Sequence, residues 1–242
     1  MGFSVDHAVT RTVRDSAAIL DQISGWRPGD TYVAPRPERP FVEEVGAVPG
    51  RLLESLGHDV TIAHPEPLED PEFQRHFLTI VTTAVAAALD RWSAALGRQV
   101  TAEEYEPVNT QFTGMGRSIA APDYVHSMLW LESYRRRMAT FWSEQGFDLL
   151  CSPVLAQQPP RLGELVDLEL GGERVIRTLQ FTGQFNVTGQ PAASLPLHWT
   201  PAGLPIGVQL VADFGREDVL IRVSSQLEQA SPWADRKPLV HA

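Results

Sequence analysis

The residues best suited to chemistry lie in a polar stretch, punctuated by glycines, that begins at Phe181 and runs directly into an apolar segment. Asn186, Thr188 and Gln190 offer hydrogen-bond donors and acceptors that could position a polar group of a small substrate. Glycines between them, such as Gly189, let the backbone approach a ligand closely. These residue types predict a small-molecule site, although an ordinary loop whose amides satisfy buried backbone has the same composition.

Other catalytic patterns are absent from the sequence. It contains no Gly-x-Ser-x-Gly elbow, no glycine-rich phosphate loop and no dinucleotide fingerprint. The histidines form no close pair and no Cys-x-x-Cys occurs, so we expect no zinc site. A new enzyme type with Ser194 or Cys151 as nucleophile is a third alternative, which the absence of a histidine at motif spacing disfavours.

Helices and strands alternate along the chain and must position the polar stretch. Helical spacing of apolar residues predicts long helices from Phe73 to Leu96 and between Pro122 and Gly146, and a last helix over 217–230. Short apolar runs predict strands at 58–62, 147–151, 193–199 and 206–211. This alternation predicts an α/β fold.

The N-terminal part predicts one helix followed by an irregular connection. Thr12 and Asp15 have the spacing of a capping box, and the helix they open ends at Gly25. Residues 26–51 are rich in proline, glycine and charge, which indicates an irregular surface connection. We expect residues 1–242 to form a single domain.

Composition and charge exclude several classes of function. The apolar fraction of 43% and the charged fraction of 21% are typical of a globular protein. A formal net charge of −10 opposes binding to DNA, RNA or anionic lipid. The basic run Arg135–Arg137 lies in a predicted helix, and we expect it to be a solvated face.

The expected location is the cytoplasm. No apolar run approaches the roughly 20 residues that a membrane-spanning helix needs. The N-terminus has neither the basic start nor the apolar segment of a signal peptide. The single cysteine, Cys151, cannot form an intramolecular disulfide, which fits a reducing compartment.

Four segments, taken together, resemble the amidase-signature family. The run from Phe181 to Pro196 is similar to the family's Phe-x-x-x-x-Asn-x-x-Gly-x-Pro-Ala-x-Ser-Leu-Pro pattern, and the Gly-Leu-Pro-x-Gly-x-Gln-Leu that follows it also matches. Val9 to Asp15 resembles the family's Thr-Arg-Ser-Val-Arg-Asp helix start. Phe147 to Pro153 resembles its Tyr/Phe-Asp-x-Leu-Leu-x-Pro strand, and Gly215 to Leu220 the start of its last helix. A chance match of all four in the right order is improbable.

This resemblance implies a mixed, twisted sheet between helices and the hydrolysis of amides without a metal or organic cofactor. The family uses a serine nucleophile, a cis-serine bridge and a lysine general base. The resemblance also implies which residues form the substrate-side wall of the pocket: Phe181, Thr182, Asn186, Thr188 and Gln190, with Cys151 or Ser152 near the strand end.

The sequence departs from the family at the catalytic residues. The Gly-Ser-rich segment that carries both serines is absent, and the only lysine, Lys237, lies in the tail beyond the last predicted helix. We therefore assign no catalytic residue and expect an incomplete fold that lacks the N-terminal catalytic half.

A second departure is internal. After Arg51, a strand and most of a helix of the family pattern are missing, so residues 26–51 end at an apparent internal deletion. Losing a strand removes partners from its neighbours and exposes apolar surface, so we expect a weakened fold or one that depends on a partner.

Two hypotheses of function remain. In the first, the chain is a partial amidase for a small-molecule amide, inactive alone, whose lysine and serines come from a complementary chain or from an upstream gene region excluded from this chain. In the second, it is a non-catalytic remnant, either a pseudoenzyme or a binding module derived from an amidase. Exposed sheet edges also make a homo-oligomer an expectation.

Overall fold

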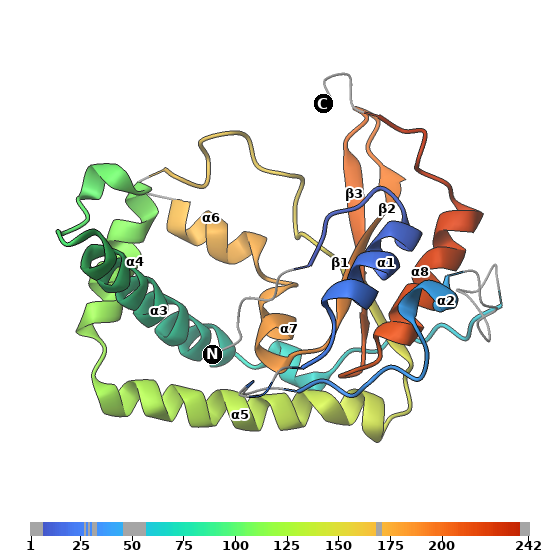
Figure 1. The fold of residues 1–242 in the computed structure, drawn as a ribbon, viewed down its shortest axis with the longest axis horizontal. Helices are drawn as coiled ribbons and strands as arrows, with labels where there is room; N and C mark the ends of the chain where they lie inside the picture. Colours follow the sequence, from blue (N-terminus) through green and yellow to red (C-terminus); the bar gives the residue numbers. More distant parts are fainter. Residues whose placement is uncertain are drawn as a thin grey trace. The chain divides into compact units, whose positions relative to one another are not determined.

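The structure is a computed structural model that describes residues 7–26, 28, 30, 33–45, 57–167 and 171–237 (Figure 1). Its residues group into two compact units. The first, here called the sheet unit, comprises Met1–His64, Ala139–Val154 and Thr188–Ala242. The second, here called the helical unit, comprises Pro65–Met138 and Leu155–Val187. That residues 1–242 fold as a single domain stays a prediction.

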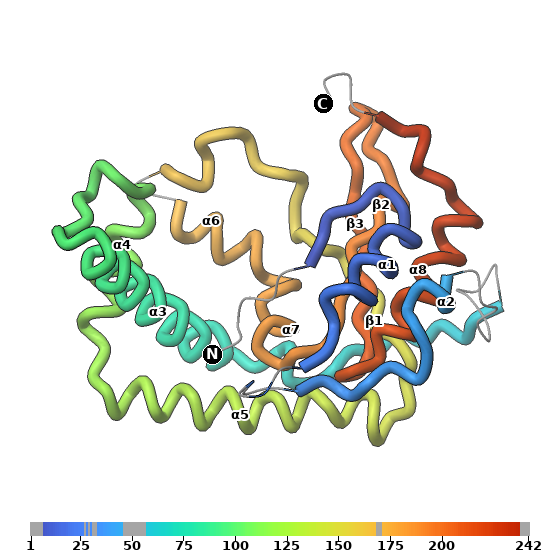
Figure 2. Tube along the Cα trace, viewed as in Figure 1, coloured from blue at the N-terminus to red at the C-terminus, as the bar shows by residue number. Residues whose placement is uncertain are grey.

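The sheet unit contains three strands in the order β1-β3-β2. They are β1 (Leu149–Pro153), β2 (Ala192–Trp199) and β3 (Pro205–Ala212), and both pairings are antiparallel. Figure 2 shows β2 and β3 side by side as a hairpin. Gly203 takes a φ of 81° in the turn between them, a conformation that favours glycine. The α/β class is confirmed; among the described strands no parallel pair occurs, so the mixed sheet of the family is represented by an antiparallel part.

Helix α8 (Glu217–Ala230) covers one face of this sheet because its apolar residues recur every three or four positions. The buried core between them is formed by Leu195, Leu210, Ala212, Leu220, Val223 and Leu227. Helix α1 (Val13–Ile23) packs beside α8. The Thr12 side chain accepts a hydrogen bond from the amide of Asp15 at 3.1 Å, so Thr12 is the N-cap, as predicted.

One short helix, α2 (Phe41–Glu44), lies within the segment predicted to be an irregular connection. Phe41 joins a core with Val13 and Ala17 of α1, and Glu44 is buried with ion pairs to Arg39 and Arg222. A helix this short depends on such contacts, which the local sequence does not reveal. The apparent deletion after Arg51 lies outside the described residues.

The strand predicted at 58–62 does not form. These residues are irregular in the structure, with a single bridge at Gly57. Ile62 is fully exposed and Val60 half-exposed, so the apolar pattern that predicts a strand faces solvent here. A strand needs a paired neighbour, and apolar alternation alone does not provide one.

The helical unit is built from packed helices and two single turns. Its elements are η1 (Glu66–Glu69), α3 (Phe73–Leu96), η2 (Ala102–Glu104), α4 (Pro107–Ser118), the N-terminal part of α5 (Ala121–Ser143), α6 (Gly171–Thr178) and most of α7 (Gly183–Thr188). The predicted bounds of α3 are confirmed, because Gly97 ends it with a φ of 67°. Helix α4 packs closely on α3 at Gly116, where a Cβ would lie 2.1 Å from the carbonyl oxygen of Thr82.

The apolar stripe predicted for the second long helix is confirmed in α5. Leu131, Tyr134, Met138 and Phe141 are each at most 2% exposed. In the part of the chain that the structure describes, no helix is long and apolar enough to cross a membrane.

Candidate functional site

Two of the predicted site residues lie on β1 in the sheet unit. Cys151 is exposed, yet the atoms around its thiol desolvate it in part and raise its pKa above the ordinary value. A thiol with a raised pKa holds little thiolate, so Cys151 is poorly prepared to act as a nucleophile. The Ser152 hydroxyl donates to the carbonyl of Pro153 at 3.2 Å and accepts from Gln209 Nε2 at 3.1 Å, so it is engaged within the sheet.

Thr188 and Gln190 lie where α7 ends and the chain turns into β2. Both are buried, at 3% and 6% exposure, and Gln190 Oε1 has no hydrogen-bond partner among the described residues. Between them Gly189 takes a φ of 82°, and a Cβ there would contact the Phe214 ring at 3.4 Å. The glycine therefore permits a left-handed turn that brings both polar side chains inward.

Phe181, Thr182 and Asn186 belong to the helical unit. All three are half-buried, at the turn before α7 and within it. The Thr182 hydroxyl donates to the carbonyl of Leu179 at 3.4 Å, a local contact that closes the turn. The seven predicted residues thus fall into two groups on two units: three here, and four in the sheet unit, on β1 and between the end of α7 and β2. Their joint role as a substrate wall stays a prediction.

Arg135 of α5 supports this region within the helical unit. Its Nε and Nη2 donate to the carbonyl oxygen of Val187 at 3.1 and 2.8 Å. Helix α7 has only six residues, so it needs tertiary support at its C-terminal end. Of the basic run predicted to be solvated, Arg136 is exposed and paired with Glu132 of its own helix, and the Arg137 side chain is 39% exposed and paired with Asp70. Arg135 is half-buried.

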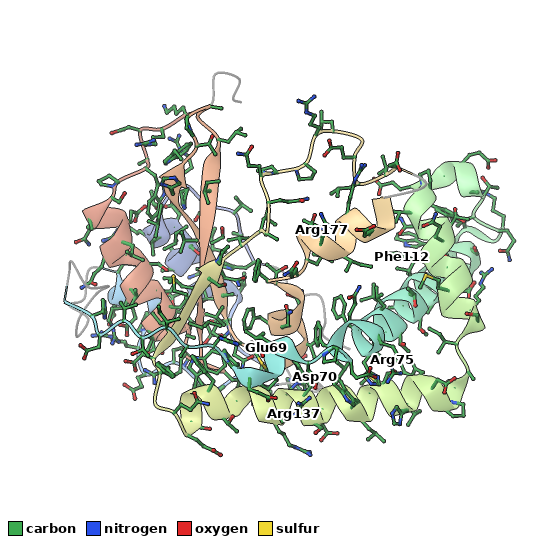
Figure 3. All side chains as sticks on the ribbon, turned by 180° about the vertical axis from the view of Figure 1, so that it is seen from behind. Glu69, Asp70, Arg75, Phe112, Arg137 and Arg177 are labelled. Atoms are coloured by element: carbon green, nitrogen blue, oxygen red, sulfur yellow. The ribbon has the colours of Figure 1, made fainter. Side chains whose placement is uncertain are left out.

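A pocket of about 490 Å³ lies inside the helical unit, among η1, α3, α4 and α6 (Figure 3). Its walls are mainly apolar: Leu68, Phe73, Phe77, Leu78, Val81, Phe112, Val175, Ile176 and Leu179. Figure 3 shows Phe112 on α4 and Arg177 on α6 beside it. Gly183 and Gln184, from the start of α7, complete the lining, so the polar stretch identified in the sequence contributes to this pocket.

Two of the three acidic side chains that line the pocket are paired with arginines. Asp70 binds Arg137 at 2.7 Å, and Glu173 binds Arg177 at 3.2 Å. Burial alone would raise the pKa of Asp70, but hydrogen bonds from Arg137 and from the amide of Glu72 outweigh it and hold this pKa below its ordinary value. With two of its three carboxylates paired and walls that are mainly apolar, the pocket suits an uncharged molecule with an apolar body.

Sequence reasoning did not identify this pocket. Its walls come from helices separated by as much as a hundred residues of chain. Each apolar residue, taken alone, is typical of an ordinary hydrophobic core. The stretch from Phe181 gave the only signal, through Gly183 and Gln184.

The described residues hold no evident catalytic base. Lys237 is exposed in the tail, as predicted. His76 Nδ1 lies 3.0 Å from Ser127 Oγ, but both side chains are at most 1% exposed, so no substrate reaches this pair. Burial, with Arg75 and His126 nearby, lowers the pKa of His76 and keeps the ring neutral. In the described ranges no group of three His, Cys, Asp or Glu residues could hold a metal ion.

Comparison with known proteins places these features in a family context. The sequence model of the family described as Amidase matches residues 50–221. The 6-aminohexanoate-cyclic-dimer hydrolase of Pseudomonas sp. (strain NK87) is 37% identical over 94% of this chain and 54% of its own length. A putative amidase, AmiC, of Mycobacterium leprae is 31% identical over 97% of this chain and 54% of its own. The chain therefore spans about half the length of these curated relatives.

Solved structures agree with these matches. A 6-aminohexanoate cyclic dimer hydrolase complexed with substrate superposes with a TM-score of 0.87, at 35% identity, over 94% of this chain and 55% of that one. A bacterial aryl acylamidase of the amidase-signature family shares the fold, with a TM-score of 0.72 at 19% identity over 95% of this chain.

The sequence alignment with the Pseudomonas relative also contains gaps. It runs over 266 positions, whereas 94% of a 242-residue chain is about 228 residues. Several tens of positions of the relative therefore face no residue of this chain.

Proposed function

The chain belongs to the amidase family, and from this premise we propose that it forms the substrate-side part of an enzyme that hydrolyses the C–N bond of a carboxylic amide. The family match over residues 50–221 carries the proposal. It is supported by the signature-like stretch from Phe181, which supplies buried polar residues before β2 and part of the lining of the pocket.

The proposed substrate is a small amide with an apolar carbon chain. Apolar walls and paired charges in the pocket of the helical unit favour an uncharged methylene chain over a charged group. The Pseudomonas relative is named for a cyclic dimer of 6-aminohexanoate, whose carbon chains have this character. As a separate part of the proposal, the predicted wall residues contact the amide group of a substrate: Phe181, Thr182, Asn186, Thr188 and Gln190, with Cys151 or Ser152 near the strand end.

Catalysis in this proposal requires groups that the 242 residues do not contain. A serine oxygen attacks the amide carbonyl while its proton passes through the bridging serine to a neutral lysine. The amine leaves with a proton, and water then releases the acid from the acyl-serine. The one lysine of this chain is exposed in the tail, so polypeptide outside these 242 residues, in the same or another chain, must supply all three groups.

A non-catalytic remnant is the second candidate, favoured by a specific observation. Several tens of positions of the Pseudomonas relative face no residue here, and the segment 58–62 exposes Val60 and Ile62 where the sequence pattern calls for a strand. A protein freed from selection for catalysis would tolerate such losses. In that case the chain is a pseudoenzyme or a binding module, and it completes no amide-hydrolysing enzyme.

Ligand binding by the chain alone tests the proposal. We expect 6-aminohexanoate cyclic dimer or hexanamide to bind weakly, observed by NMR line broadening of pocket methyl groups. Val81→Trp should abolish the signal by filling the pocket, whereas Ala87→Trp, exposed on the same helix and outside the lining, should not. Equal broadening in both variants would place binding elsewhere. Hydrolysis by the chain alone that survives Lys237→Ala would contradict the proposed mechanism.

We also propose a cytoplasmic location and no nucleic-acid or membrane partner. The net charge of −10 opposes binding to nucleic acid or to an anionic membrane. The single cysteine, which is unpaired in the structure, fits a reducing compartment.

A further inference from the structure

A buried tyrosine of α5 lies beside the pocket of the helical unit. Tyr134 is 0% exposed, and its hydroxyl has no hydrogen-bond partner among the residues that the structure describes. The centroid of its ring lies 4.9 Å from the centroid of the Phe73 ring, and Phe73 lines the pocket. Because a buried hydroxyl without a partner costs stability, its presence in this core calls for an explanation.

The ion pair of Asp70 and Arg137 lies close to this hydroxyl (Figure 3). The Arg137 guanidinium carbon is 5.6 Å from the centroid of the Tyr134 ring. Burial raises the pKa of Tyr134, Arg137 lowers it and Asp70 raises it, so both charges of the pair act on the hydroxyl. The Asp70 carboxylate already accepts hydrogen bonds from Arg137 at 2.7 Å and from the amide of Glu72 at 3.0 Å. Asp70 itself lines the pocket, which places the hydroxyl near one end of the cavity.

The Phe73 ring separates the hydroxyl from the cavity. Phe73 is the first residue of α3, is half-buried and lines the pocket, whereas Tyr134 is outside the lining. Glu72, at the N-cap, makes no side-chain capping bond, so side-chain contacts hold much of this first turn. Rotation of the Phe73 ring about its side-chain bonds opens a path from the pocket to the hydroxyl without breaking a backbone hydrogen bond.

The charges around the hydroxyl favour an uncharged hydrogen-bond acceptor as its partner. The Arg137 cation polarises the O–H bond and makes it a better donor. The charged side chains of the lining are Glu69, Asp70, Glu173 and Arg177. The three acids outnumber Arg137 and Arg177 together, so a carboxylate ligand would meet net negative charge. A carbonyl oxygen accepts a hydrogen bond and brings no charge into a mainly apolar cavity.

We propose that the Tyr134 hydroxyl is a donor subsite of the pocket, which binds the carbonyl oxygen of an uncharged ligand when the Phe73 ring turns aside. The apolar body of the ligand fills the cavity in front of it. This inference rests on the proposed function, since it adds a contact to the same substrate. A carbonyl held at so buried a hydroxyl is out of reach of a nucleophile. The substrate class is therefore amides that carry a second carbonyl group along the carbon chain.

The carbonyl resonance of a bound ketone tests the proposal directly. 2-Heptanone labelled with carbon-13 at its carbonyl is titrated into the full chain, and NMR gives both its affinity and its bound chemical shift. We expect a downfield shift of the carbonyl carbon, because a donated hydrogen bond withdraws electron density from it. In Tyr134→Phe the shift should disappear and the affinity should fall about fivefold. Heptane, which has no carbonyl group, should bind the two proteins equally.

Two further variants provide matched controls. Tyr124→Phe removes a hydroxyl from the same helix outside the lining, and should change neither the shift nor the affinity. Val81→Trp fills the pocket and should abolish binding of both ligands. Because the Tyr134 hydroxyl has no partner among the described residues, Tyr134→Phe should unfold at no lower a temperature than the wild type. The carbonyl shift in the wild type does not depend on any variant.

The outcomes separate this inference from the proposed function when hexanamide and hexanoate are titrated in the same way. Hexanamide that fills the pocket equally well with and without the hydroxyl overturns the subsite and leaves the function standing. Binding of 2-heptanone that depends on the hydroxyl, without binding of hexanamide, supports the subsite and contradicts the function. Tighter binding of hexanoate than of 2-heptanone, or no downfield shift in the wild type, overturns the subsite for an uncharged carbonyl. A pocket that binds none of these ligands overturns both.

Discussion

The buried carboxylate of Glu44 offers a quantitative test of how the N-terminal segment is held. Glu44 is 3% exposed and accepts hydrogen bonds from Arg39 at 2.5 and 2.8 Å and from Arg222 at 2.8 and 3.0 Å. The hydrogen bond from Arg39 is the largest influence, and with Arg222 it outweighs desolvation and lowers the pKa of Glu44 from 4.5 to about 2. We expect Glu44→Gln to remove most of the stability linked to this shift.

The size and pH dependence follow from that pKa. Because each pKa unit corresponds to about 1.4 kcal/mol, a folded-state pKa of about 2 against 4.5 in the unfolded chain stabilises the fold by about 3 kcal/mol at pH 7. The folded-state pKa is the lower one, so this stability is present above pH 4.5 and is lost as the pH falls toward 2. At pH 3 only about 1 kcal/mol remains.

Urea unfolding of wild type and variants at pH 7 and pH 3 measures this contribution. Glu43→Gln is the matched control, because Glu43 is the exposed neighbour on the same helix and should change the free energy of unfolding by less than about 0.5 kcal/mol. A loss for Glu44→Gln that is equal at both pH values would refute the reasoning, since it would reflect packing and not charge.

Three further predictions concern the helical unit. Gly116→Ala should lower the free energy of unfolding by about 1–3 kcal/mol, because the added methyl group would clash with the backbone of α3. Gly114→Ala, which has open space around it, should raise the free energy of unfolding by about 0.5–1 kcal/mol. Thermal unfolding measures both effects. Arg135→Ala should speed amide exchange in α7 on the order of tenfold, while Arg136→Ala should leave it unchanged. Burial lowers the pKa of His76, so the wild type should lose stability as the pH falls below 6.5; unfolding titrations of His76→Gln that show the same loss would contradict this.

Local pattern was sufficient for the regular elements near the candidate site. Helix α3 has the predicted bounds because apolar residues recur at helical spacing up to a left-handed glycine, Gly97. The hairpin of β2 and β3 follows from two apolar runs separated by proline and glycine. The seven predicted site residues lie on β1, in and just before α7, and just before β2, but their assignment to the substrate wall is still untested.

Features that depend on distant residues were beyond sequence reasoning. Glu44 meets Arg222 across 178 positions, and Arg135 meets Val187 across 52, so neither contact leaves a local pattern. The pocket likewise needs residues of five elements, η1, α3, α4, α6 and α7, to come together. The strand predicted at 58–62 does not form for the opposite reason: its local pattern is present, but no strand among the residues that the structure describes pairs with it.

The most direct test of the account measures amide hydrolysis after the chain is combined with a catalytic half. The purified chain, the unmatched part of the Pseudomonas relative and their co-expressed mixture are each incubated with 6-aminohexanoate cyclic dimer, and the released amine is quantified. The account predicts hydrolysis by the mixture alone, with loss of activity when the lysine of the added half is replaced. A folded mixture that forms a complex and releases no amine would contradict it.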